Sequence, residues 1–164
     1  TFFSATMSDP YSGKAVFLEK MRRYCAYQER CQSEVIQKMK ELKIDFEWQD
    51  DIIVSLIEEQ YLNEERYTRA IVHGKFSMKS WGRIRIRQFL LLRNIHERMI
   101  DEMLKEIDPD LYLEKAKQVA EKKWRTMDQK TEPFLQKKQL MQYLYQKGYE
   151  SAVASIAIDD IFPR

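Results

Sequence analysis

The sequence contains few of the residues that make turns. Only 4 Gly and 4 Pro occur among its 164 residues, whereas a sheet-rich chain needs a turn about every 8 to 12 residues. Lys, Glu, Gln, Leu, Met and Arg are abundant instead, and all of them favour helices. The composition therefore predicts an all-α fold.

Residues that hold metals, cofactors or disulfides are scarce as well. Cys25 and Cys31 are the only cysteines, which is too few for a disulfide framework or a four-cysteine zinc site. His73 and His96 lie 23 residues apart, with no other Cys or His at ligand spacing. The glycines are isolated, so they form no phosphate-binding loop. We therefore expect no metal, no cofactor and no catalytic residue, and we expect Cys25 to be a core residue and Cys31 to start a helix.

Long apolar runs are also missing. No stretch approaches the roughly 20 apolar residues of a membrane span, and no signal-peptide pattern is present. We therefore expect a cytoplasmic protein without a membrane partner.

Charge is segmented along the chain rather than in large excess. The formal net charge is only +2, which does not by itself predict a nucleic-acid partner. Nine acidic residues and one lysine lie between residues 41 and 65, however, and six basic residues with no acidic one lie between residues 75 and 93. Within the basic stretch, "WGRIRIRQ" (81–88) alternates Arg and Ile with the period of a half-buried strand, although its surroundings look helical.

Three stretches of the chain align with one another without gaps. They are "EVIQKMKELKI" (34–44), "RIRQFLLLRNI" (85–95) and "QLMQYLYQKGY" (139–149). Apolar residues recur at three places, which are Val35, Ile86 and Leu140, then Met39, Leu90 and Leu144, then Ile44, Ile95 and Tyr149. Before the last of these stands Lys43, Asn94 or Gly148, where a helix end often turns left-handed. We match the helices that follow through Ile52, Met99 and Val153.

A period near fifty residues, seen three times, predicts tandem three-helix units. We expect helices at about 14–29, 32–43, 48–60, 64–78, 82–93, 96–106, 109–125, 133–147 and 150–158. The units are an acidic repeat 1 (14–61), a repeat 2 with a basic centre (62–107) and a repeat 3 (108–158), between a flexible or non-native leader (1–13) and a tail (159–164). Because the alternating segment aligns with helical residues of repeat 1, we interpret it as a helix, with a strand as the less favoured alternative.

Four segments resemble the RecX family, whose members regulate the RecA recombinase. They are "YCAYQERCQSEVIQKMKEL", "IIVSLIEEQYLNEERYTRAIVHGKF", "KSWGRIRIRQFLLLRNI" and "QYLYQKGYESAV". The resemblance covers about residues 15–158, and its most specific part is "YLNEERYTRAIV" followed by "WGRIRIRQFL". Three residues depart from the family's pattern. Cys31 stands where the family often has Ser, Trp81 where it often has Pro or Lys, and Phe89 where Glu is usual.

The resemblance implies an elongated, curved array of three three-helix repeats that binds the RecA–DNA filament. It also implies that the protein restrains RecA's ATP hydrolysis, strand exchange and filament growth, in the groove or at an end. The lack of catalytic residues predicts that it is not an enzyme, and polar outer faces on the terminal repeats favour a monomer. The expected partners are the RecA filament and DNA, single- or double-stranded, contacted directly or through RecA. We assign this surface to Arg66, Arg69, Lys75, Lys79, Trp81, Arg83, Arg85, Arg87 and Arg93.

Two alternatives stay open at this point. Trp81, between Lys79 and Arg83, is either a packed anchor or an exposed contact for protein or base. The basic residues fit a sequence-independent DNA-binding module that acts through phosphates alone, as well as a filament regulator, because arginine pairs with both carboxylate and phosphate. They are equally consistent with a plain solvated helix face.

Overall fold

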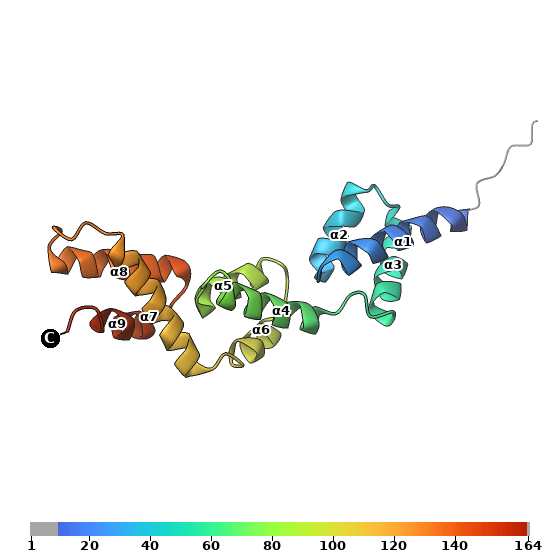
Figure 1. Cartoon of the computed structure of the whole chain (residues 1–164). Coiled ribbons are helices and arrows are strands. Elements are labelled where there is room, and N and C mark those ends of the chain that lie inside the picture. The colour runs from blue at the N-terminus through green and yellow to red at the C-terminus, as the bar shows by residue number, and fades with distance from the viewer. Residues whose placement is uncertain (1–9, 164) are drawn as a thin grey trace, which may run out of the picture. The chain divides into compact units, whose positions relative to one another are not determined.

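The computed structural model describes residues 10–163, with side chains from residue 13 onward, and all regular structure in that range is helical (Figure 1). The nine helices of this range are α1 (Pro10–Tyr27), α2 (Gln32–Glu41), α3 (Phe46–Glu58), α4 (Glu64–Ser77), α5 (Arg83–Leu91), α6 (Glu97–Leu104), α7 (Pro109–Arg125), α8 (Pro133–Lys147) and α9 (Ser151–Asp159). The all-α prediction is confirmed, and the alternating Arg–Ile segment is helical from Arg83. Of the predicted leader, residues 1–9 lie outside the described residues, and α1 already begins at Pro10.

The chain divides into two compact units, and the boundary between them lies between Tyr67 and Thr68, inside α4. In the first unit, α1, α2 and α3 pack around a shared apolar core. Cys25 belongs to this core, as predicted, and burial raises the pKa of its thiol to about 11. Cys31 precedes α2, where its backbone N–H donates to the Glu34 carboxylate at 3.2 Å. Both cysteine side chains are buried.

The repeat pattern is confirmed position by position. All nine aligned apolar residues are at most 4% exposed. Lys43, Asn94 and Gly148 have positive φ angles of 54°, 60° and 99°. After each of them, a backbone N–H bonds back to the buried residue five positions earlier, at 3.0, 3.2 and 3.0 Å. These left-handed ends turn the chain sharply from the second helix of each repeat into the third.

The match proposed for the third helices is wrong by four residues. The helices α3, α6 and α9 follow Asp45, His96 and Glu150, each directly after the last aligned apolar residue. From these starts, Ile52 corresponds to Met103 and Ala157, which are 0%, 6% and 0% exposed. The residues proposed earlier, Met99 and Val153, are only half-buried. Neighbouring apolar pairs on short helices look alike in sequence, and only the helix start fixes the register.

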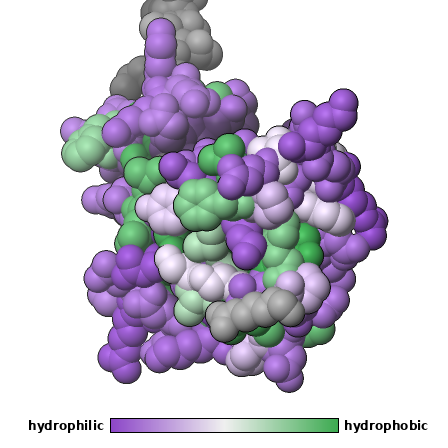
Figure 2. Space-filling model, turned by 90° about the vertical axis from the view of Figure 1, so that its left-hand side faces the viewer, coloured by the Kyte–Doolittle hydropathy of each residue, from purple (hydrophilic) through white to green (hydrophobic). Residues whose placement is uncertain are grey.

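In the second unit, α7 contacts both α8 and α9. Small buried residues line the contact side of α7 and α9, namely Ala116, Ala120, Ala154 and Ala157, so the two backbones can approach closely. Seen from the α8–α9 side, the surface has apolar patches surrounded by hydrophilic residues (Figure 2). Within the described chain, no helix combines the length and the apolar character that a membrane span requires.

Candidate functional site

The basic helix α5 begins on the backbone of repeat 3. The N–H groups of Gly82 and Ile84 donate to the carbonyls of Lys147 and Gly148 at 2.7 and 3.0 Å. A Cβ on Gly82 would lie 2.3 Å from the Gly148 carbonyl oxygen, so only glycine permits this approach. The free amides at the start of α5 thus meet the free carbonyls at the end of α8, which satisfies both helix ends and aligns their dipoles favourably.

A partly buried polar network holds the first turn of α5. The Tyr112 hydroxyl donates to the Glu150 carboxylate at 2.5 Å and accepts the backbone N–H of Arg83 at 3.0 Å. The Arg83 guanidinium donates to Glu150 at 2.8 Å and lies 3.8 Å from the centre of the Tyr112 ring. Burial, followed by the bond to Glu150, raises the pKa of Tyr112 far above its ordinary value. Arg83 is therefore committed to positioning its own helix.

Arg87 also has partners inside the second unit. Its guanidinium donates to Asp101 and Glu97 at 3.0 Å each. These bonds, that to Asp101 most, raise the pKa of Arg87 above its ordinary value. Arg69 likewise reaches the carboxylate of Glu106 at 3.4 Å.

Arg66 is tied into the first unit. Its Nε atom donates to Glu29 at 2.5 Å, and its terminal nitrogen donates to the Gln60 carbonyl at 3.0 Å. It therefore joins the start of α4 to the loops after α1 and α3. Four of the predicted binding residues thus pair with carboxylates of the same chain, namely Arg66, Arg69, Arg83 and Arg87.

Three of the four remaining basic residues gather around two aromatic rings. Trp81 and Phe89 meet edge to face, with ring centres 5.7 Å apart. The Lys75 ammonium lies 4.8 and 4.7 Å from these two ring centres, Arg85 lies 4.2 Å from that of Trp81, and Arg93 lies 3.5 Å from that of Phe89. We call these five residues the cationic cluster.

Helix geometry explains the cluster. Arg85, Phe89 and Arg93 are spaced by four residues, so they lie along one side of α5 and the turn after it. Trp81 is fixed by its backbone N–H, which donates to the Lys75 carbonyl at 3.0 Å. Phe89 is the member that the site prediction omits, and its i+4 spacing from Arg85 is the signal that identifies it.

Trp81 acts as a support for cations. Its ring is half-buried, and both Arg85 and Lys75 lie over it. The packed-anchor alternative therefore describes its geometry better than a freely exposed stacking platform. Lys79 is exposed and forms no ion pair within the described chain; Met78, which precedes it, and Leu92, which precedes Arg93, are 82% and 83% exposed.

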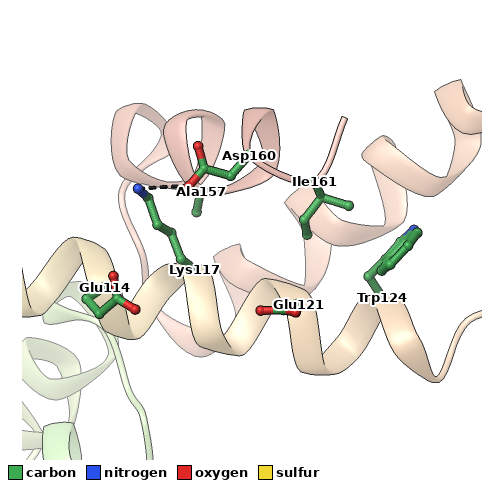
Figure 3. A pocket seen from close by; sticks show the side chains of 7 residues that line it. All are labelled: Glu114, Lys117, Glu121, Trp124, Ala157, Asp160 and Ile161. Atoms are coloured by element: carbon green, nitrogen blue, oxygen red, sulfur yellow. Dashed lines mark ion pairs between the residues drawn. The ribbon is translucent and has the colours of Figure 1, made fainter. Parts of the chain in front are cut away.

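A hollow of about 430 Å³ lies between α7 and α9 (Figure 3). Lys117 on α7 reaches Asp160 after α9 at 2.8 Å, and this hydrogen bond raises the pKa of Lys117. Because its one cation is neutralised in place, this hollow is a weaker binding site than the cationic cluster. Among the described residues, no group of three or more His, Cys, Asp and Glu side chains is placed to hold a metal ion.

Comparison with known proteins identifies the family. The model of the second three-helix domain of RecX matches residues 63–104, and that of the third three-helix domain matches residues 110–158. The chain belongs to the RecX family. The RecX domain matched at 63–104 contains the whole cationic cluster. The one matched at 110–158 supplies Tyr112, Gly148 and Glu150, which hold α5.

Individual relatives agree with this assignment. The chain is 30% identical over 145 residues to "Regulatory protein RecX" of Limosilactobacillus reuteri (strain DSM 20016), an alignment covering 88% of this chain and 54% of the relative. It is 31% identical over 140 residues to that of Lactococcus lactis subsp. lactis (strain IL1403), covering 84% and 52%. The chain therefore spans about half the length of these curated relatives.

Solved structures show the same fold. A crystal structure of regulatory protein RecX superposes with a TM-score of 0.82 at 27% identity, covering 89% of this chain and 73% of that one. The structure of RecX from Lactobacillus salivarius gives 0.79 at 22% identity, covering 92% and 97%. At that identity the second likeness concerns the fold alone.

Proposed function

We propose that this chain is a non-enzymatic regulator that binds the RecA–DNA filament, in its groove or at its end, through the cationic cluster. Binding restrains the filament's ATP hydrolysis, strand exchange and growth. Membership of a family whose relatives are named regulatory proteins supports the general role. The observation that carries the site is the arrangement of Lys75, Arg85 and Arg93 over the rings of Trp81 and Phe89.

The chemistry of the cluster suits an acidic partner surface. Lys75 and Arg85 contact aromatic rings and form no ion pair with a carboxylate of the described chain. A cation over a ring keeps its N–H donors at the edge, where carboxylate or phosphate oxygens can accept them. The rings also restrict these long side chains before binding, which lowers the entropy lost when a partner docks.

The mechanism we propose is a brace. Repeat 3 fixes α5 through the backbone contact at Gly82 and Gly148 and through the network of Arg83, Tyr112 and Glu150. Because α5 is held in this way, the cationic cluster keeps its position and opposes movement of the partner surface bound to it. The filament protomers would then be hindered in the rearrangement that accompanies nucleotide turnover or end growth.

The test is a charge reversal of the cluster, Lys75→Glu with Arg85→Glu. These residues form no ion pair in the described chain, unlike Arg83 and Arg87, so reversing them breaks no salt bridge, although Arg85 does donate to the Gln146 carbonyl at 3.4 Å. A matched control reverses two exposed lysines elsewhere, Lys122→Glu with Lys138→Glu. The readout is RecA's ATP hydrolysis on single-stranded DNA as each protein is titrated in at fixed salt.

We expect the cluster variant to need at least about tenfold more protein for half-maximal inhibition, since losing two charge-assisted contacts costs more than 1.4 kcal/mol. The control is expected to match the parent within about twofold. Equal inhibition by the cluster variant and the control would refute the proposed site.

A second candidate function is sequence-independent DNA binding, because the same donors suit phosphates. Three basic residues, Lys75, Lys79 and Arg85, form no ion pair with a carboxylate of the described chain. Three phosphate contacts predict a log–log salt slope of about −3 on duplex DNA. A slope of that size, together with inhibition only at concentrations that coat bare DNA, would favour this function over filament regulation.

A further inference from the structure

The outer side of α3 in the first unit is apolar, although it faces solvent. Phe46, Val54 and Ile57 are 82%, 50% and 45% exposed. At 3.6 residues per turn they fall within an arc of about 80°. The adjoining side of the helix buries Ile52, Ile53 and Leu56 in the core. The apolar face of α3 is thus wider than the part of it that is covered within its unit.

Carboxylates border this outer side and are not neutralised. Glu47, Asp50 and Glu58 are exposed, and none forms an ion pair within the described chain. Their immediate neighbours differ, because Asp51 pairs with Lys14 at 2.5 Å and Glu59 pairs with Arg22 at 2.7 Å, both from α1. Among the described residues of the first unit, cations therefore pair with carboxylates on the side of α3 that faces α1 and with none of the three on the outer side.

A small hollow continues the apolar surface at the end of α3. It measures about 250 Å³, and its lining combines the apolar Ile57 and Leu62 with four polar residues, Gln32, Gln60, Asn63 and Glu64. The stretch from Phe46 to Ile57 spans about 16 Å at 1.5 Å per residue. That length matches about three turns of a second helix laid alongside.

We propose that the outer face of α3, defined by Phe46, Glu47, Asp50, Val54, Ile57 and Glu58, docks an amphipathic basic helix of a protein partner. The apolar residues would contact the apolar side of that helix, and the carboxylates would pair with its flanking Lys and Arg side chains. Nucleic acid and anionic membrane surfaces are disfavoured by like charge. A symmetric contact with a second copy would set the same carboxylates against each other.

This proposal goes beyond the cationic cluster, because it concerns the other unit and a partner surface of opposite charge. It is independent of RecA binding, and its failure leaves the proposed function standing. The two surfaces together would let one chain engage an acidic and a basic surface at once.

The test uses a fluorescent synthetic peptide of about 14 residues, made of Leu and Lys with Leu at i, i+3, i+4 and i+7. A second peptide has the same composition in an order that destroys this period. Binding is followed by fluorescence anisotropy at roughly 0.1 M salt. The variants are Asp50→Lys with Glu58→Lys, and Val54→Gln, which changes the apolar surface without charge. A control with equal charge change, Glu114→Lys with Asp159→Lys, lies in the second unit.

We expect micromolar binding of the periodic peptide, weakened about tenfold by the double charge reversal and about fivefold by Val54→Gln. The control should bind within about twofold of the parent, and the rearranged peptide about tenfold more weakly. Equal loss in the control and the α3 variant would overturn the proposal, because charge alone would then explain binding. Parent protein that dimerises in sedimentation, but not after the α3 reversal, would also overturn it by making a second copy the occupant.

Discussion

Replacing Gly148 with alanine tests how repeat 3 holds the basic helix. Gly148 has φ +99°, and a Cβ there would lie 2.5 Å from both the backbone nitrogen and the Cβ of Arg85. Neither atom is the movable end of a side chain, so the two backbones must separate. That separation strains the two hydrogen bonds at 2.7 and 3.0 Å from Gly82 and Ile84.

Two effects lower the free energy of unfolding of Gly148→Ala, a strained backbone conformation and weakened hydrogen bonds. A left-handed conformation costs a non-glycine residue about 1–2 kcal/mol, and each weakened hydrogen bond costs about 0.5–1.5 kcal/mol. We therefore expect Gly148→Ala to lower the free energy of unfolding by about 2–5 kcal/mol. The control is Asn94→Ala, at the same place in repeat 2, where φ is 60° and a side chain is already present. It should cost only about 1 kcal/mol.

Urea unfolding followed by far-UV circular dichroism measures both variants against the parent chain. The larger loss for Gly148→Ala isolates the backbone contact between repeats 2 and 3, because both variants place alanine at a left-handed position. A loss no larger than that of Asn94→Ala would refute the reasoning. The double variant, Gly148→Ala with Gly82→Ala, should lower the free energy of unfolding by less than the sum of the two single variants, since both substitutions disturb the same backbone contact.

Three further predictions follow from burial and pairing. Burial holds the pKa values of Tyr112 and Tyr149 well above normal, so the folded state keeps two protons that the unfolded state loses near pH 10. The contribution of these two tyrosines to the free energy of unfolding should thus be constant below about pH 9 and fall by about 2–3 kcal/mol per pH unit above about pH 10, and urea midpoints that do not change with alkaline pH would contradict this. Leu90→Ala removes a fully buried side chain and should lower the free energy of unfolding by about 2–5 kcal/mol in the same urea assay, with a loss under about 1 kcal/mol counting against the assigned core. The hydrogen bond from Arg22 lowers the pKa of Glu59. The stabilisation from this ion pair is therefore complete above the ordinary Glu pKa and is lost as pH falls through the lowered pKa of Glu59. Arg22→Gln should flatten the acid side of the pH–stability curve, and an unchanged curve would exclude the pair as a contributor.

The fold is largely predictable from the sequence because its apolar pattern repeats. Ile86 and Leu90 would be ambiguous alone, but their alignment with Val35 and Met39 identifies the Arg–Ile segment as helical. The left-handed end at Gly148 is predictable for the same reason. The third-helix match failed where helices are short, because their apolar residues fit more than one register.

The candidate site is only partly predictable. The sequence locates the basic stretch, but it does not show which arginines are neutralised within the chain. Arg83 pairs with Glu150, 67 residues away, and Arg87 pairs with Asp101, 14 residues away. Such pairs depend on how α5 meets α6 and α9, and no local pattern encodes that. The position of Phe89 in the cluster can be predicted from its spacing of four residues from Arg85, provided that the segment is assigned as a helix.

The central claim is that the cationic cluster grips a protein filament rather than bare DNA. The most direct measurement compares two concentrations of this protein at one salt: that for half-maximal inhibition of RecA's ATP hydrolysis on single-stranded DNA, and that for half-saturation of the same DNA without RecA. We expect inhibition at a concentration at least about tenfold below that for DNA saturation, and we expect Lys75→Glu with Arg85→Glu to remove this difference. Equal concentrations for both, in the parent chain, would contradict it.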